Sequence, residues 1–175
     1  MTTYPFTQLT RRRALTLGLK AALAAGLAPA VALSPAQAHE IKFKDLLIVH
    51  PWVRQTPANA QVAGGFLKII NKGKEPDRLV SATAEIATSV QIHDMTMNGD
   101  VMEMVELPKG VEILPGKTVE FKPKHLHLML MGLKDQPMPG SVFKGTLTFE
   151  KAGTVDIEFE VQEMGKDEPS HGAMQ

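Results

Sequence analysis

The sequence of 175 residues contains no cysteine. No disulfide can therefore hold the fold together, and its stability must come from the hydrophobic core. The absence also removes thiolate as a metal ligand, and it excludes an anchor attached through a lipidated cysteine.

Acidic residues are absent from the first 38 positions, which contain four basic residues. Arg11–Arg13 precede an apolar stretch rich in Ala and Leu, and Ala36-Gln37-Ala38 fits a signal cleavage site. One lysine and two prolines interrupt the apolar stretch, whereas a membrane-spanning helix needs about 20 apolar residues. We therefore expect residues 1–38 to be a cleaved export signal rather than a membrane anchor.

The same segment leaves two export routes open. Thr10-Arg11-Arg12-Arg13-Ala14-Leu15 resembles part of a twin-arginine signal, while the basic, apolar and cleavage segments also suit the ordinary secretory route. Either route takes the protein out of the bacterial cytoplasm. We expect a periplasmic protein that does not span the membrane once mature.

Removal of the signal leaves 15 basic and 19 acidic residues, a net charge near −4. This balance argues against a nucleic-acid partner, which would require a basic surface. The remaining length suits one domain, which we place at residues 39–162 and expect to be monomeric. Residues 163–175 are polar and contain two glycines and a proline, so we expect a flexible tail.

Short segments with strand-like patterns recur between turn signals after the predicted signal. Asn98-Gly99-Asp100 is a strong hairpin turn, because Asn-Gly accepts positive φ. A possible helical turn near Ala84–Ser89 is the one helical signal. The pattern predicts an all-β Greek-key β-sandwich of about nine strands. The predicted strands are 40–50, 62–71, 77–84, 89–97, 101–107, 117–122, 126–131, 142–150 and 154–162.

Three of these segments combine an aliphatic face with a face that holds His and Met. Side chains alternate between the two faces of a strand, so Leu126, Leu128 and Leu130 share one face. The opposite faces carry Gln91, His93, Met95 and Met97 in the first segment, Met102, Met104 and Glu106 in the second, and His125, His127, Met129 and Met131 in the third.

Metal binding explains this combination of side chains better than burial or solvation does. Met is a common core filler, but His is a poor choice for a second core face because a buried imidazole must find hydrogen-bond partners. A solvent-facing surface would be expected to carry Lys, Thr and Glu rather than Met. The pattern therefore predicts a metal site built from imidazoles and thioethers.

The softness of these ligands indicates copper. Thioether and imidazole together suit Cu(I) better than zinc, calcium or magnesium. A blue-copper electron-transfer site requires a cysteine thiolate, which this sequence does not have. Thioethers bind copper with moderate strength, as a carrier that releases its cargo requires. Only the imidazoles compete with protons, so copper affinity should weaken near their pKa of about 6.5.

The candidate ligands resemble the signature of the periplasmic copper chaperones called PCu(A)C, a His, a Met about eleven positions later and a distant His-x-Met. Met104 follows His93 by eleven positions, and His127-Leu128-Met129 supplies the last pair. The interval between Met104 and His127 is one residue longer than the family spacing, and a hairpin could absorb the extra residue. The resemblance covers residues 40–161.

The resemblance implies a cupredoxin-like fold and one Cu(I) bound by His93, Met104, His127 and Met129. It also implies a copper-transfer protein rather than an enzyme. The cargo would go to the apo copper-accepting subunit of cytochrome c oxidase, or to an intermediary copper carrier, for assembly of the oxidase copper centre. The alternative is a copper tolerance or storage protein that retains its ion. A metal-free adhesion-type sandwich and a copper enzyme that uses His39 are further rivals.

Four other residues are candidates for additional copper binding. His39 would become the mature N-terminus, where its amine and imidazole could bind Cu(II) weakly, although a frayed end is the simpler interpretation. The tail offers His171 and Met174. His125 faces the same side as His127 and could be a spare ligand or an outer partner of the site.

Overall fold

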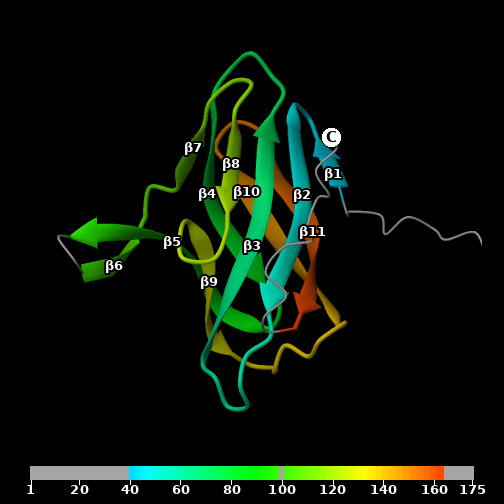
Figure 1. Cartoon of the computed structure of the whole chain (residues 1–175). Helices are drawn as coiled ribbons and strands as arrows, with labels where there is room; N and C mark the ends of the chain where they lie inside the picture. The colour runs from blue at the N-terminus through cyan, green and yellow to red at the C-terminus, as the bar shows by residue number, and fades with distance from the viewer. Residues whose placement is uncertain (1–39, 99–100, 164–175) are drawn as a thin grey trace, which may run out of the picture. The chain divides into compact units, whose positions relative to one another are not determined.

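The computed structural model describes residues 40–98 and 101–163, which form eleven strands and no helix (Figure 1). The strands are β1 (Glu40–Phe43), β2 (Leu46–Arg54), β3 (Val62–Asn71), β4 (Asp77–Ala84), β5 (Ala87–Asn98), β6 (Val101–Glu106), β7 (Val111–Ile113), β8 (Thr118–Phe121), β9 (His127–Leu133), β10 (Val142–Phe149) and β11 (Gly153–Gln162). The all-β prediction is confirmed. No described segment is a helix that could cross a membrane.

The strand count exceeds the predicted nine for two reasons. The segment predicted as one strand over residues 40–50 divides at Lys44, whose φ of 52° turns the chain between β1 and β2. The short strand β7 was not predicted at all. The helical turn expected near Ala84–Ser89 is wrong, because a tight turn at Glu85 and Ile86 leads directly into β5.

Several predicted features lie outside the described residues. These are the export signal with His39, the tail apart from Glu163, and residues 99 and 100 of the hairpin turn between β5 and β6. The division of the chain into signal, domain and tail therefore stays a prediction.

The strands follow one hydrogen-bonded path in the order β6-β5-β9-β3-β2-β11-β10-β4-β7, while β1 pairs with β2 and β8 with β3. β11 runs parallel to β2 and antiparallel to β10. The path curls over, so that β10 and β11 lie behind β2 and β3 in Figure 1. Apolar side chains from both layers fill the space between them.

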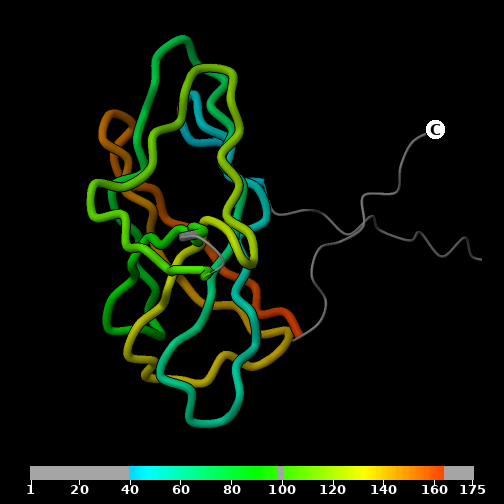
Figure 2. The backbone as a smooth tube through the Cα atoms, turned by 60° about the vertical axis from the view of Figure 1, so that its left-hand side comes forward, coloured from blue at the N-terminus to red at the C-terminus, as the bar shows by residue number. Residues whose placement is uncertain are grey.

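The predicted leucine face of β9 lies in this core. Leu128 and Leu130 are fully buried, and Ile92 of β5 packs in the same cluster. The aliphatic face of β6 is different, since Val101 and Val105 are 61% and 42% exposed. β5 pairs with β9 only as far as His93, and beyond it the β5/β6 hairpin continues without a third strand. The hairpin extends away from the other strands in Figure 1, and Figure 2 shows it turned toward the viewer.

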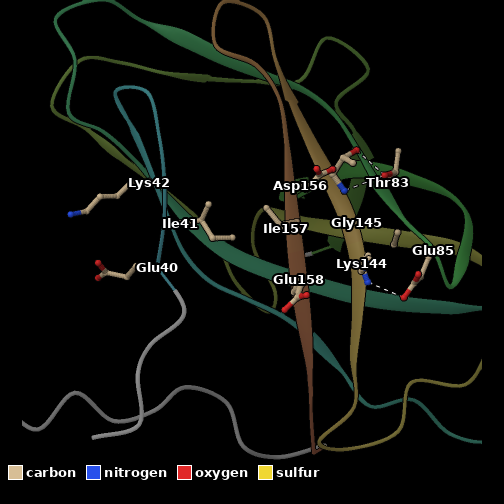
Figure 3. Close-up of a pocket in the computed structure, with 12 residues that line it drawn as sticks. Glu40, Ile41, Lys42, Thr83, Glu85, Lys144, Gly145, Asp156, Ile157 and Glu158 are labelled. Carbon is tan, nitrogen blue, oxygen red and sulfur yellow. Dashed lines mark hydrogen bonds between the residues drawn. The ribbon is translucent and has the colours of Figure 1, made fainter.

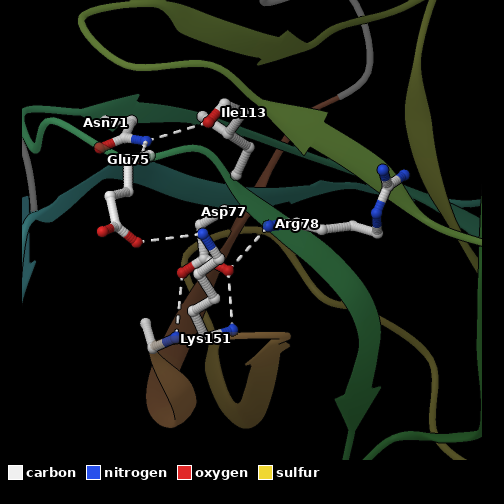
Figure 4. A network of polar contacts seen from close by, with 7 residues as sticks. Asn71, Glu75, Asp77, Arg78, Ile113 and Lys151 are labelled. Atoms are coloured by element: carbon white, nitrogen blue, oxygen red, sulfur yellow. Dashed lines mark hydrogen bonds and ion pairs between the residues drawn. The ribbon is translucent and has the colours of Figure 1, made fainter.

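Two buried polar side chains, Asn71 and Asp77, form hydrogen bonds with neighbouring strands and turns (Figure 4). Asn71 donates to the carbonyls of Glu75 and Ile113 at 2.7 and 2.9 Å. The carboxylate of Asp77 accepts from the backbone N–H groups of Arg78, Lys151 and Ala152 at 2.7, 2.9 and 3.0 Å. These contacts join β4 to the turn between β10 and β11, and they satisfy groups that burial would otherwise penalise.

β2 contains an irregularity at His50 and Pro51. The register with β3 shifts between Val49 and Trp52, and His50 has a φ of 51°. A bulge is a position where a sheet tolerates proline, which has no N–H to donate. The ring Nε2 of His50 lies 2.8 Å from Nε2 of Gln162 on β11. His50 is therefore a structural residue within the strand rather than at its end.

Candidate metal site

The register of three neighbouring strands joins the predicted His/Met faces into one surface. His93 of β5 lies opposite His127 of β9 on one side and opposite Glu106 of β6 on the other. Residues directly opposite in antiparallel strands point to the same face of the sheet. The further pairs on this face are Ser89 with Met131, Gln91 with Met129, Met95 with Met104, and Met97 with Met102.

The two imidazoles form the centre of this face. Their ring centroids are 5.9 Å apart, and the rings meet edge to face at 61°. His127 is 6% exposed, and His93 is half-buried. Two imidazoles at this distance can approach a common ion, because the metal–nitrogen distances in proteins are about 2.0–2.1 Å on each side.

A backbone carbonyl selects the free nitrogen of His127. Its Nδ1 lies 2.7 Å from the carbonyl oxygen of His125. A carbonyl only accepts, so Nδ1 carries the hydrogen and Nε2 keeps its lone pair. This arrangement is usual for metal-binding histidines, whose second nitrogen donates to a carbonyl or carboxylate that fixes the ring.

The other imidazole has a buried nitrogen with no hydrogen-bond partner. Nε2 of His93 donates to Oε1 of Gln91 at 3.0 Å. Nδ1 of His93 is buried and has no hydrogen-bond partner among the described residues. A buried acceptor left unpaired is costly in an ordinary protein core. A metal ion that takes up this lone pair removes the penalty, so the residues present fit a metal.

The surroundings of His93 favour the neutral ring that a metal needs. Burial lowers the pKa of His93, and the nearby His127 lowers it further, while the carboxylate of Glu106 raises it. The net effect is a pKa below the ordinary value of about 6.5 for an imidazole. The lone pair is therefore available at neutral pH without displacement of a proton.

The two candidate thioethers lie on either side of the histidine pair. Met129 lies two residues along β9 from His127, opposite Gln91, and Met104 lies two residues along β6 from Glu106, opposite Met95. Two residues along a strand span roughly 7 Å. Met104 is on β6, the strand farther from His127, and is 48% exposed. The fold thus brings both histidines and Met129 close together, and it leaves Met104 at the margin.

Aromatic side chains bound the other edge of the site. Gly64 of β3 lies opposite Met129, and a Cβ at Gly64 would stand 3.0 Å from the Phe66 ring. Phe66 in turn packs against Trp52, with ring centroids 4.5 Å apart. Both rings are buried although they lie outside the main core cluster. The two rings form an apolar surface on the side of Met129. Gly64 leaves room for the Phe66 ring because it has no Cβ.

A hollow elsewhere in the structure has different chemistry (Figure 3). It is lined by residues of β1, β4, β10 and β11 and the turn that follows β4, and it contains carboxylates and lysines but neither His nor Met. None of these elements supplies a candidate ligand. The histidine pair therefore remains the candidate metal site.

Sequence reasoning missed the role of one contributor and the way in which another acts. Gln91 was recognised as a member of the face, but not as the partner that orients the His93 ring. His125 lies in the turn before β9 with an exposed side chain, and it acts through its backbone carbonyl. Within the described residues, no three His, Cys, Asp or Glu side chains form a metal-binding group, so a site here depends on methionine.

A model of the family described as "Putative lipoprotein LpqE-like" matches residues 46–161, well over half of the chain. The chain belongs to the LpqE-like family. All four candidate ligands fall within the matched residues. The relative "Putative lipoprotein Lxx21020" of Leifsonia xyli subsp. xyli is 30% identical over 112 residues, which cover 64% of this chain. The chain spans 66% of that relative, just under two thirds of its length.

Several solved structures are similar in fold to this LpqE-like chain. The copper-bound PCuAC domain from PmoF2 is 27% identical, with a TM-score of 0.62, and the match covers 72% of this chain and 99% of that domain. The Cu(I) form of DR1885 from Deinococcus radiodurans is 25% identical, with a TM-score of 0.56 and coverage of 73% and 81%. The resemblance to PCu(A)C proteins and the cupredoxin-like fold are confirmed.

Proposed function

We propose that this protein carries one Cu(I) ion on His93, Met104, His127 and Met129 and transfers it to another copper protein outside the cytoplasm. The observation that carries the proposal is the pair of free imidazole nitrogens. Nδ1 of His93 is buried without a partner, and Nε2 of His127 is left free by the hydrogen bond at Nδ1. The copper-bound PCuAC neighbours support the choice of metal.

The choice of oxidation state follows from the ligands. Two neutral imidazoles and two neutral thioethers are soft enough for Cu(I), and they leave the bound ion with its single positive charge. Hard divalent ions prefer oxygen ligands. Glu106 lies opposite His93 on β6 and supplies the nearest negative charge on this face.

The position of Met104 favours a carrier over a storage protein. Its side chain is half exposed on the outlying hairpin, so a ligand from a partner protein can reach the ion as Met104 leaves. The expected acceptor is the apo copper-accepting subunit of cytochrome c oxidase or an intermediary copper carrier. A storage protein would gain by burying all of its ligands.

Anaerobic Cu(I) titration against a competing chelator tests the site. We expect the wild-type protein to bind one tight equivalent, and we expect His127→Ala to lose more affinity than the about 10–100-fold that removal of an outer partner costs. Met129→Leu removes one thioether at nearly constant volume and should weaken binding less. Met138→Leu is the matched control, because Met138 is exposed on the loop between β9 and β10, outside the His/Met face. Unchanged binding in the His127 variant would overturn the proposed site.

A transfer experiment separates the carrier from the storage protein. The Cu(I)-loaded protein is mixed with an apo oxidase-subunit domain, and the copper content of each is measured after separation. Appearance of copper on the acceptor supports transfer. Retention of the ion by the donor against an acceptor of higher affinity would identify a storage protein instead.

A further inference from the structure

The β5/β6 hairpin carries methionines that the histidine site does not use. Met97 lies opposite Met102, and Met95 lies two residues before Met97 on the same face. Met97 and Met102 are 62% and 50% exposed. Exposed hydrophobic side chains scattered singly need no explanation, but three thioethers side by side on an outlying hairpin are a set of soft ligands.

The phase of the hairpin hydrogen bonds brings these side chains close together. The N–H of Leu107 donates to the carbonyl of Ile92 at 2.8 Å, so residues 92 and 107 form a hydrogen-bonded pair. Such pairs alternate along an antiparallel ladder with pairs that are not hydrogen-bonded, whose Cα atoms are only about 4.5 Å apart. Met97 and Met102 fall in this second class. Their thioethers can therefore converge on one ion.

The chemistry of the group points to a monovalent soft metal. Thioethers are neutral, weak donors that select Cu(I) over harder ions. The Met side chain has three rotatable bonds and adapts its sulfur position easily. The carboxylates of Asp94 and Glu103 lie on the opposite face of the hairpin. On the methionine face, the pairs Met95–Met104 and Met97–Met102 offer sulfur only, and Glu106 is the next residue of β6 on that face.

We propose that Met95, Met97 and Met102 form a second Cu(I) site on the hairpin, occupied at the same time as the histidine site and with lower affinity. This site uses no imidazole and leaves Met104 to the first ion. Its use as the point where Cu(I) enters or leaves the protein rests on the proposed function, but the binding itself does not.

Titration of the full-length protein with Ag(I), a redox-stable substitute for Cu(I), tests the second site. We expect two equivalents to bind, and we expect the second to shift the methyl NMR signals of Met95, Met97 and Met102. The double variant Met97→Leu/Met102→Leu should bind one equivalent, because leucine keeps the volume and removes the sulfur. The control Met138→Leu should still bind two.

A second double variant, His93→Ala/His127→Ala, separates this inference from the proposed function. It should lose the tighter ion and keep the hairpin ion. Saturation of the wild type at one equivalent, or a second equivalent that survives in the Met97/Met102 variant, would overturn the hairpin site. Two equivalents in the histidine variant with unchanged affinities would instead overturn the proposed function and leave the hairpin site standing.

Discussion

Gln91 decides which nitrogen of His93 faces the candidate metal. Its side-chain oxygen holds Nε2–H of the ring at 3.0 Å, and Nδ1 is thereby left as the free donor. The carbonyl of His125 does the same for the other ring, through Nδ1 of His127. One imidazole would thus bind copper through Nδ1 and the other through Nε2.

Replacement of Gln91 tests this orienting role. We expect Gln91→Leu to weaken Cu(I) affinity about 10-fold, at the lower end of the effect of losing an outer partner of a metal ligand. Competition with a Cu(I) chelator measures the change. Ser89→Ala is the control, since Ser89 lies on the same face two residues earlier. Equal affinities in the two variants would show that Gln91 does not orient the ring.

The lowered pKa of His93 predicts how the stability and the Cu(I) affinity of the protein depend on pH. Burial is the first cause of the lowering and His127 the second. Because the folded protein holds a proton on His93 less tightly than the unfolded chain does, stability of the metal-free protein should fall as the pH drops below about 6.5. For the same reason, Cu(I) affinity should persist to a lower pH than an ordinary imidazole allows. Chelator competition at a series of pH values measures the midpoint, and a midpoint above 6.5 would contradict the prediction.

Side-chain alternation was enough to predict that His93, His127 and Met129 share one face, but not the roles of their hydrogen-bond partners. His93 and His127 stand out because a leucine or isoleucine face lies behind each of them. The role of Gln91 depends on the rotamers of two side chains on one strand, and that of His125 on the path of a turn. Neither is a property of residue type or spacing, so the sequence does not contain a signal for them.

At the scale of elements, the β5/β6 hairpin is the part of the site that has no third strand beside it. Met104 lies beyond the last β5–β9 residue pair and on the strand farther from His127. An ion held between the two imidazoles and bound by the sulfur of Met104 would link the hairpin to β9. Copper binding should therefore order the hairpin more than any other element.

Hydrogen exchange checks this expectation. We expect Cu(I) to slow amide exchange in β5 after His93 and in β6, because the bound ion ties the hairpin to β9. β10 and β11 should show little change, since they contribute no ligand and serve as an internal control. Met104→Leu should reduce the protection of the hairpin while the histidine pair still binds copper. Uniform protection of all strands would contradict a copper link between the hairpin and β9.

The predicted elements agree with the structure wherever alternation is long and fail where a local conformation decides. β3 and β4 begin and end at the predicted residues. The break at Lys44 was missed, because a lysine with positive φ is uncommon and no glycine marks the turn. β7 has three residues, too few for a period-two pattern to be recognised.

At the scale of the whole molecule, replacement of Asp77 measures how much its hydrogen bonds contribute to the stability of the sandwich. Asp77→Ala leaves three backbone N–H groups without their acceptor. An unsatisfied buried donor costs about 1–3 kcal/mol, so we expect a loss of roughly 3 kcal/mol in the free energy of unfolding and a fall in Tm of roughly 10 °C. Thermal unfolding followed by circular dichroism measures it.

The exposed ion pair between Arg78 and Glu150 provides the comparison for the Asp77 variant. Glu150 contacts Nε of Arg78 at 3.4 Å, and its side chain is 62% exposed, so Glu150→Ala should cost no more than about 1 kcal/mol. Both variants should bind Cu(I) as the wild type does in the folded state, because neither residue lies on a strand that carries a candidate ligand. Equal Tm values for the two variants would show that the Asp77 contacts contribute no more than a surface pair.

The parallel pairing of β11 with β2 has a consequence for synthesis on the ribosome. β11 is the last strand of the described chain, and it is the link between β6-β5-β9-β3-β2 and β10-β4-β7. Until it emerges, the nascent chain can form only two partial sheets with open edges, which are prone to wrong pairing. The long-range pairing that completes the fold must wait until β11 has been synthesised. We therefore expect the polypeptide to depend on protection from aggregation until its final strand is available.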